Sequence, residues 1–300
     1  MRARSPLVLL AAALIGGCGH RAATPAAGSG SDGSSASLLA RAGTPCGPLD
    51  CRQYDSLEEA FESAIGGRPR VVAVGEAHAQ KGTTVPSAAR RFTERVLPLL
   101  AGRASDLLVE LTNPPAGCAK TAEVVRQQQS VVTRAQAPTD QGEYVAMGER
   151  ARQLGIVPDL LRPSCADLDA VRDAGDDAIV ASLEMIARLT RAQAEKLLDR
   201  DLRTPGDADR FVVTYGGAIH NDPDPPKERA AWSFGPALAA YVGGRYVAID
   251  LYVPELFDDS DAWKRLPFYR HYDAARLGGK TAVFHQGRTV VIVLPRTPAP

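Results

Sequence analysis

The chain has no hydrophobic run long enough to cross a bilayer, and it has no strongly basic segment. A transmembrane helix needs about 20 consecutive apolar residues, whereas the apolar run at residues 7–15 has only nine. Lysine and arginine are spread along the 300 residues without a run of five or more, and acidic residues equal them in number. These absences argue against a membrane-spanning protein and against nucleic acid as a partner.

The short apolar run has the features of a secretory signal. Arg2 and Arg4 precede it and Gly16-Gly17-Cys18 follows it, so residues 1–17 are predicted to be a signal peptide. The small residues before Cys18 resemble a bacterial lipobox, in which the cysteine becomes the lipidated N-terminus; a plain signal peptide cut nearby is the alternative. We therefore expect an extracytoplasmic lipoprotein, in the periplasm or at the cell surface, that contacts the membrane only through its lipid anchor.

Four further cysteines remain after Cys18, namely Cys46, Cys51, Cys118 and Cys165. An even number of cysteines in an oxidising compartment predicts two disulfides. Of the possible pairings, the short loop Cys46 to Cys51 and the long loop Cys118 to Cys165 are favoured. A zinc site built from the four cysteines is the competing interpretation, but the sequence has no CxxC spacing to support it.

Residues 18–44 are rich in Gly, Ser and Ala and are predicted to be a flexible tether. Residues 45–300 then form one α/β domain. Valine-rich runs without polar alternation predict buried strands, and helical patterns lie between them. The expected strands are 70–75, 106–111, 156–161, 210–215 and 246–253, with a hairpin at 281–284 and 289–294. The expected helices are a short one after Ser56, then 86–100, 119–133, 140–154, one after Ser164, 176–202 with a break at Thr190, and 228–242. This order predicts a mostly parallel central sheet with helices on both faces and a C-terminal antiparallel hairpin.

Two short phrases place a histidine where a buried strand should end. They are Gly75-Glu76-Ala77-His78 and Gly217-Ala218-Ile219-His220. Ligands of parallel α/β sheets bind outside the carboxyl ends of the strands, so both histidines could face one site. Glu76 and His78 are two residues apart and point the same way in extended backbone. Glu110 lies near the end of another apolar strand, where an unpaired charge would be costly.

These four residues suit a site with two histidines and one or two carboxylates, which binds Zn²⁺, Mn²⁺, Co²⁺ or Fe²⁺. His78 and His220 would be metal ligands, and Glu76 and Glu110 would serve as further ligand and as general base. In a hydrolase the metal lowers the pKa of bound water and polarises a carbonyl. A lone histidine is more often a satisfied core residue, but the repeated phrase favours a shared site.

Three motifs resemble those of the superfamily of ChaN-type haem-binding uptake proteins, erythromycin-esterase-like hydrolases and Tiki/TraB peptidases. They are Gly75-Glu76-Ala77-His78, Leu108-Val109-Glu110-Leu111 and Tyr215-Gly216-Gly217-Ala218-Ile219-His220, in that order. Residues 144–156 are similar to the helix before the third strand in the ChaN branch. The resemblance covers about residues 56–253 and implies an EreA/ChaN-like fold in which His78, His220, Glu76 and Glu110 form the shared centre.

The resemblance leaves three functions open. The first is a metal-dependent hydrolase that acts on a peptide or ester bond of a small-molecule or peptide substrate. The second is a haem or iron carrier that uses the same cleft without turnover, and the third is an interaction module that has kept only the fold. Weaker site candidates are Asp250 in a buried strand, His271 among aromatic residues, His285 in the predicted hairpin turn, and His20 in the tether.

Overall fold

The computed structural model describes residues 43–137, 140–204, 206–257 and 260–297. The predicted signal peptide, Cys18, His20 and nearly all of the predicted tether lie outside these residues. Within them the strands are β1 (Thr44–Gly47), β2 (Cys51–Tyr54), β3 (Val71–Glu76), β4 (Ala104–Thr112), β5 (Val157–Leu161), β6 (Phe211–Gly217), β7 (Tyr246–Tyr252), β8 (Thr281–Gln286) and β9 (Thr289–Val293). No helix of the described residues has the length and hydropathy needed to cross a membrane.

All of these strands belong to one sheet, with the order β1-β2-β8-β9-β7-β3-β6-β4-β5. The strands from β9 to β5 pair in parallel, and β1, β2 and β8 add an antiparallel edge. The predicted mixed α/β class, the mostly parallel sheet and the hairpin of β8 and β9 are thus confirmed. The hairpin of β1 and β2 was not predicted, because its short and partly exposed strands carry no apolar pattern.

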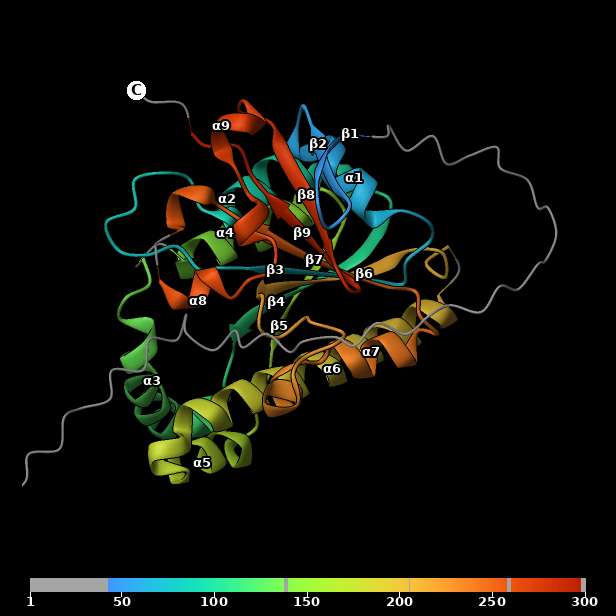
Figure 1. Cartoon of the computed structure of the whole chain (residues 1–300). Helices are drawn as coiled ribbons and strands as arrows, with labels where there is room; N and C mark the ends of the chain where they lie inside the picture. Colours follow the sequence, from blue (N-terminus) through green and yellow to red (C-terminus); the bar gives the residue numbers. More distant parts are fainter. Residues whose placement is uncertain (1–42, 138–139, 205, 258–259, 298–300) are drawn as a thin grey trace, which may run out of the picture.

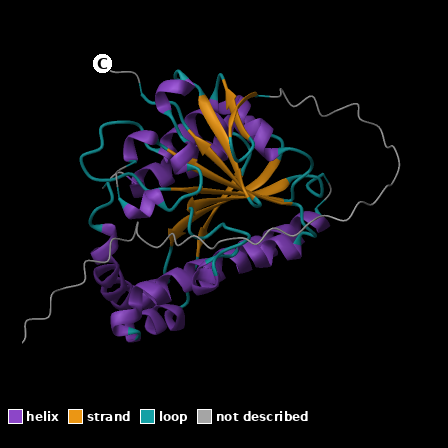
Figure 2. Cartoon of the chain, in the orientation of Figure 1, coloured by secondary structure: helices purple, strands orange, loops and turns teal. Residues whose placement is uncertain are grey.

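The α-helices are α1 (Leu57–Ile65), α2 (Ala88–Arg91), α3 (Ala119–Thr133), α4 (Asp140–Gln153), α5 (Cys165–Asp173), α6 (Ala178–Arg203), α7 (Gly235–Tyr241), α8 (Asp261–Lys264) and α9 (Ala274–Leu277). A π-helical turn occupies Phe92–Val96, and 3₁₀ turns occupy Leu97–Leu100, Ala116–Cys118, Gly175–Asp177, Lys227–Trp232, Pro254–Leu256 and Tyr269–His271. Helices cover both faces of the sheet (Figures 1 and 2). Buried residues of α1, α2 and α4 pack on one face, and those of α6 and α7 pack on the other.

Three helix predictions differ from the structure in their details. The segment 86–100 is α2 followed by the π and 3₁₀ turns, because Pro98 has no N–H group with which to continue an α-helix. Residues 228–242 divide at Ser233, whose hydroxyl bonds to the carbonyls of His220 and Asp222. The predicted break at Thr190 is wrong: α6 is continuous, and Thr190 is buried beneath the sheet instead of capping a new helix.

Both predicted disulfides are present, Cys46–Cys51 and Cys118–Cys165. The second joins the start of α3 to the start of α5. These two helices and the first half of α6 share a small hydrophobic cluster that contains no residue of the sheet. In Figure 1 they form a helical arm that extends away from the strands.

The long disulfide should stabilise the fold more than the short one. It closes a loop with a sequence separation of 47 residues, against 5 for Cys46–Cys51, and the loop-entropy model gives about 4 and about 2 kcal/mol respectively. We expect urea denaturation of Cys118→Ser/Cys165→Ser to show the larger loss in free energy of unfolding, with Cys46→Ser/Cys51→Ser as the matched comparison. Equal losses would contradict a loop-length effect.

Candidate functional site

The predicted site residues lie at the carboxyl ends of three adjacent strands. Strand β6 pairs in parallel with β3 on one side and β4 on the other. In this register Glu76, the last residue of β3, is opposite Gly217, the last residue of β6. Glu110 comes directly after Val109, which is opposite Tyr215. The sheet therefore brings Glu76, Glu110 and the segment that leads to His220 to one edge, as the two histidine phrases predicted.

One half of the site is built around the buried carboxylate of Glu76. Its Oε1 atom lies 3.1 Å from His78 Nδ1 and accepts a hydrogen bond of 2.8 Å from the Tyr144 hydroxyl. Its Oε2 atom accepts a bond of 2.7 Å from the Tyr215 hydroxyl. Only 2% of the Glu76 side chain is exposed, against 26% for His78. The imidazole thus reaches the surface while its carboxylate partner stays inside.

The two tyrosines of this half come from different layers. Tyr215 lies in β6 and Tyr144 in α4, and their rings meet edge to face with centroids 5.6 Å apart. Burial, followed by the negative charge of Glu76, raises the pKa of Tyr144 well above its ordinary value. Tyr144 therefore keeps its proton at neutral pH and can donate a hydrogen bond to Glu76.

The other half of the site pairs Glu110 with His220. Glu110 Oε2 accepts a hydrogen bond of 2.7 Å from the backbone N–H of Gly217, and Glu110 Oε1 lies 3.6 Å from His220 Nε2. His220 Nδ1 is 2.7 Å from the carbonyl oxygen of Trp232. A carbonyl can only accept, so Nδ1 carries a proton there and Nε2 faces the carboxylate.

The two halves meet over Gly217. A methyl group added to its Cα would lie 3.4 Å from His78 Nε2, 3.7 Å from Glu110 Oε2 and 3.8 Å from His220 Cδ2. At Gly216 the added carbon would overlap Glu110, 2.2 Å from Oε2. The double glycine thus leaves the space in which three of the four predicted residues converge.

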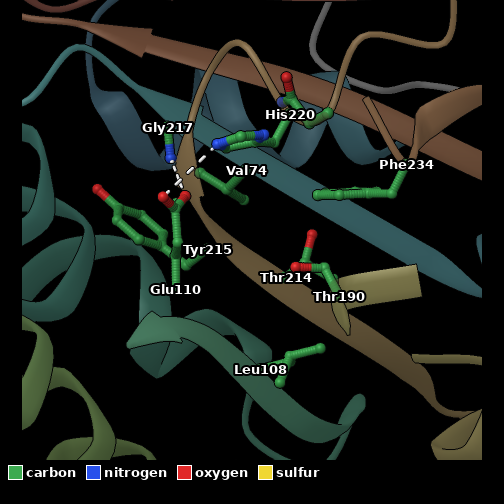
Figure 3. A pocket seen from close by; sticks show the side chains of 11 residues that line it. Val74, Leu108, Glu110, Thr190, Thr214, Tyr215, Gly217, His220 and Phe234 are labelled. Carbon is green, nitrogen blue, oxygen red and sulfur yellow. Dashed lines mark hydrogen bonds and ion pairs between the residues drawn. The ribbon is translucent and has the colours of Figure 1, made fainter. Parts of the chain in front are cut away.

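A small cavity lies beneath Glu110 and His220 (Figure 3). Its volume is about 10 Å³, and it is lined by Val74, Leu108, Glu110, Thr190, Thr214, Tyr215, Gly216, Gly217, His220, Asn221 and Phe234. Thr214 Oγ1 and Asn221 Oδ1 are buried there without a hydrogen-bond partner. This is about the smallest space that can hold one water molecule, which needs two to four polar partners.

The imidazole and carboxylate groups near Gly217 are of the type that binds a divalent metal, but they are too far apart to coordinate one as they stand. Among the described residues no three His, Cys, Asp or Glu side chains are arranged to hold a metal ion. Even so, the 3.6 Å between His220 Nε2 and Glu110 Oε1 exceeds a hydrogen bond. It is near the separation of about 3.4 Å between two ligands of a tetrahedral zinc. His78, Glu110 and His220 would need to draw together to reach bonding distance.

The weaker candidates lie away from this centre. Asp250 of β7 is buried behind the strand ends and accepts a hydrogen bond of 2.9 Å from the Asn221 side chain. His271 is partly buried beside Phe268, Tyr269 and Tyr272, which belong to a cluster packed on the sheet. His285 is an exposed residue of strand β8 and does not lie in the hairpin turn as predicted, because the strand continues to Gln286.

Sequence reasoning missed the groups that hold the site residues in place. Tyr144 and Tyr215 both lie within the motifs used for the resemblance, but neither was given a role. Tyr215 could have been noticed from the sequence, because a tyrosine stands directly before the two glycines at the end of its strand. No pattern in the sequence could indicate that the carbonyl of Trp232 binds His220, because that contact depends on the path of the loop between them.

No protein-family model matches the chain, and no curated protein matches it. Two solved structures are distantly similar. The type III effector HopBA1 is 13% identical, with 85% of this chain and 100% of that chain covered and a TM-score of 0.35. A Bacillus cereus protein is 11% identical, with 80% and 92% covered and a TM-score of 0.38. Both TM-scores are too low to support a conclusion about fold or function.

Replacement of Thr214 tests whether the cavity holds a water molecule. If water bonds to Oγ1, Thr214→Val loses that bond and should lower the free energy of unfolding by about 1 kcal/mol. Thr281 is the matched control, since its buried Oγ1 also lacks a partner but does not line this cavity. Thr281→Val should therefore be neutral or stabilising in urea denaturation. The same result for Thr214→Val would mean that the cavity is dry.

Asp250 should make the stability depend on pH. Burial raises its pKa to about 7, although the hydrogen bond from Asn221 opposes the rise. The folded state thus favours the protonated carboxyl. This contribution is fully present below about pH 4 and is lost as the pH rises through about 7. We expect the free energy of unfolding of the wild type to fall over this window relative to Asp250→Asn. Parallel curves for the two proteins would contradict the assignment.

Proposed function

We propose that the chain is a hydrolase that acts on a peptide or ester bond at the centre over Gly217, with a divalent metal as cofactor. The observation that carries the proposal is the convergence of His78 Nε2, Glu110 Oε2 and the His220 ring on the position of one missing methyl group. Two imidazoles and a carboxylate around an open space are the donor set that hydrolytic metal sites use.

A metal held by His78, His220 and Glu110 would lower the pKa of its bound water and polarise the carbonyl group of the peptide or ester bond to be cleaved. The chain's own groups supply the rest. The Gly217 N–H fixes Glu110 Oε2, so Oε1, 3.6 Å from His220 Nε2, would accept the proton that the attacking water gives up. The Trp232 carbonyl fixes the His220 ring in the tautomer that presents Nε2.

The resemblance to the ChaN, erythromycin-esterase and Tiki/TraB superfamily supports the same centre and an EreA/ChaN-like fold. The proposal extends to location: the chain is an extracytoplasmic lipoprotein anchored through Cys18. The two disulfides support an oxidising compartment.

Metal analysis of the purified full chain is the decisive experiment. We expect about one equivalent of Zn, Mn, Co or Fe, and hydrolysis of peptide or ester substrates that a chelator abolishes. Gly217→Ala should lose the metal and at least about 100-fold of the activity, because the added methyl group would occupy the space of the metal. The variant should still fold, since the methyl group would meet its neighbours only at ordinary van der Waals distances. His78→Ala and His220→Ala should lose the metal as well.

His285→Ala is the matched control, since it removes an exposed histidine far from the site, and it should keep the metal and the activity. A chain without stoichiometric metal, whose histidine variants behave like the wild type, would contradict the proposal. A haem titration followed by absorbance belongs to the same experiment. Stoichiometric haem binding that His78→Ala abolishes, without hydrolysis, would favour the alternative of a haem carrier.

A further inference from the structure

The carboxylate of Glu76 is fully engaged by neighbours that the proposed mechanism does not use. Oε1 receives the Tyr144 hydroxyl and faces His78 Nδ1, while Oε2 receives the Tyr215 hydroxyl. A buried carboxylate is costly unless such donors satisfy it. Here two hydroxyls and one ring N–H do so, and Glu76 is the acceptor in all three contacts.

The two tyrosines are themselves held by packing. The ring of Tyr215 contacts the Phe92 ring with centroids 4.8 Å apart, and it meets the Tyr144 ring edge to face. Both residues are at least 95% buried. Their hydroxyls are therefore fixed from two directions, by helix α4 on one side and by strand β6 on the other.

We propose that Tyr144 and Tyr215 form a clamp that makes Glu76 a positioning residue for His78, and that Glu76 is neither a metal ligand nor the general base. The inference rests on the proposed function in one respect, namely that His78 belongs to the centre over Gly217. It changes the role that the sequence predicted for Glu76 and adds two residues to the site.

The chemistry of the clamp follows from its hydrogen bonds. The Tyr144 hydroxyl also lies 3.3 Å from His78 Nδ1, but it donates its proton to Glu76 Oε1 at 2.8 Å. A carboxylate only accepts, so at 3.1 Å from Oε1 the Nδ1 atom of His78 carries the ring proton. The lone pair then lies on Nε2, the atom nearest to the space over Gly217. His220 is fixed in the same tautomer by the Trp232 carbonyl. Both imidazoles thus carry their lone pair on Nε2, which faces the space over Gly217 in His78 and Glu110 Oε1 in His220. Glu110 is left as the carboxylate beside the space.

The first test measures the tautomer of His78 in the metal-free chain by ¹⁵N NMR of the imidazole. We expect Nδ1–H in the wild type, a shift towards Nε2–H in Tyr144→Phe/Tyr215→Phe, and a larger shift in Glu76→Ala. Phenylalanine keeps the ring packing, so the double variant should remain folded. An Nε2–H tautomer in the wild type, or no change in either variant, would overturn the clamp. This readout needs neither metal nor substrate, so it separates the clamp from the hydrolase proposal.

The second test is a double-mutant cycle on metal affinity and kcat. Groups that orient a metal-ligating histidine typically contribute 10–100-fold, and we expect a loss of that order for Tyr215→Phe with little change in KM. Because the Tyr215 hydroxyl bonds to Glu76 Oε2, the loss should nearly vanish when Tyr215→Phe is made in Glu76→Ala. Tyr54→Phe is the matched control: Tyr54 is buried and bonded to Ser63, but lies in β2. Additive losses in the cycle would contradict action through Glu76.

Discussion

The centre depends on one steric constraint, the absence of side chains at Gly216 and Gly217. The side chain of Glu110 crosses from β4 over the end of β6, and a Cβ at Gly216 would overlap it. The same approach lets the Gly217 N–H bind Glu110 Oε2. A larger residue at either position would push the carboxylate away from His220 or fill the space that His78 faces. Parallel pairing aligns the strand ends, but only the glycines let their side chains share one space.

Around this space, polar groups are fixed in pairs from the two faces of the sheet. Glu76 is held among aromatic residues on the face covered by α4, and Glu110 and His220 border the cavity on the face covered by α6. Each imidazole has its Nδ1 atom bound to an acceptor, a carboxylate for His78 and a backbone carbonyl for His220. Buried polar groups require such partners, and here the same bonds orient the two rings. The same contacts thus satisfy buried polar groups and fix the orientation of both rings.

The sequence predicted those features that depend on local pattern. Buried valine-rich strands, the order of β-α units, both disulfides and the strand-end positions of His78 and His220 follow from short segments and from the rules of parallel sheets. What it could not predict depends on packing between distant segments. Thr190 has the local pattern of a helix cap but is buried by the sheet. Tyr144 reaches Glu76 only because α4 packs against β4 and β5, on the same face of the sheet as the Glu76 side chain. Trp232 contributes a backbone carbonyl, which its residue type does not reveal.

The helical arm of α3, α5 and the first half of α6 has its own hydrophobic cluster, which adjoins the core on the sheet at Leu189. A segment with a separate core can open locally without exposing the main core, so its amide protons and its peptide bonds can become accessible to exchange and to proteases before the strands unfold. Helix α4, which carries Tyr144, lies in the chain between α3 and α5. Local opening of the arm would therefore act on the chain at both ends of the helix whose Tyr144 bonds to Glu76.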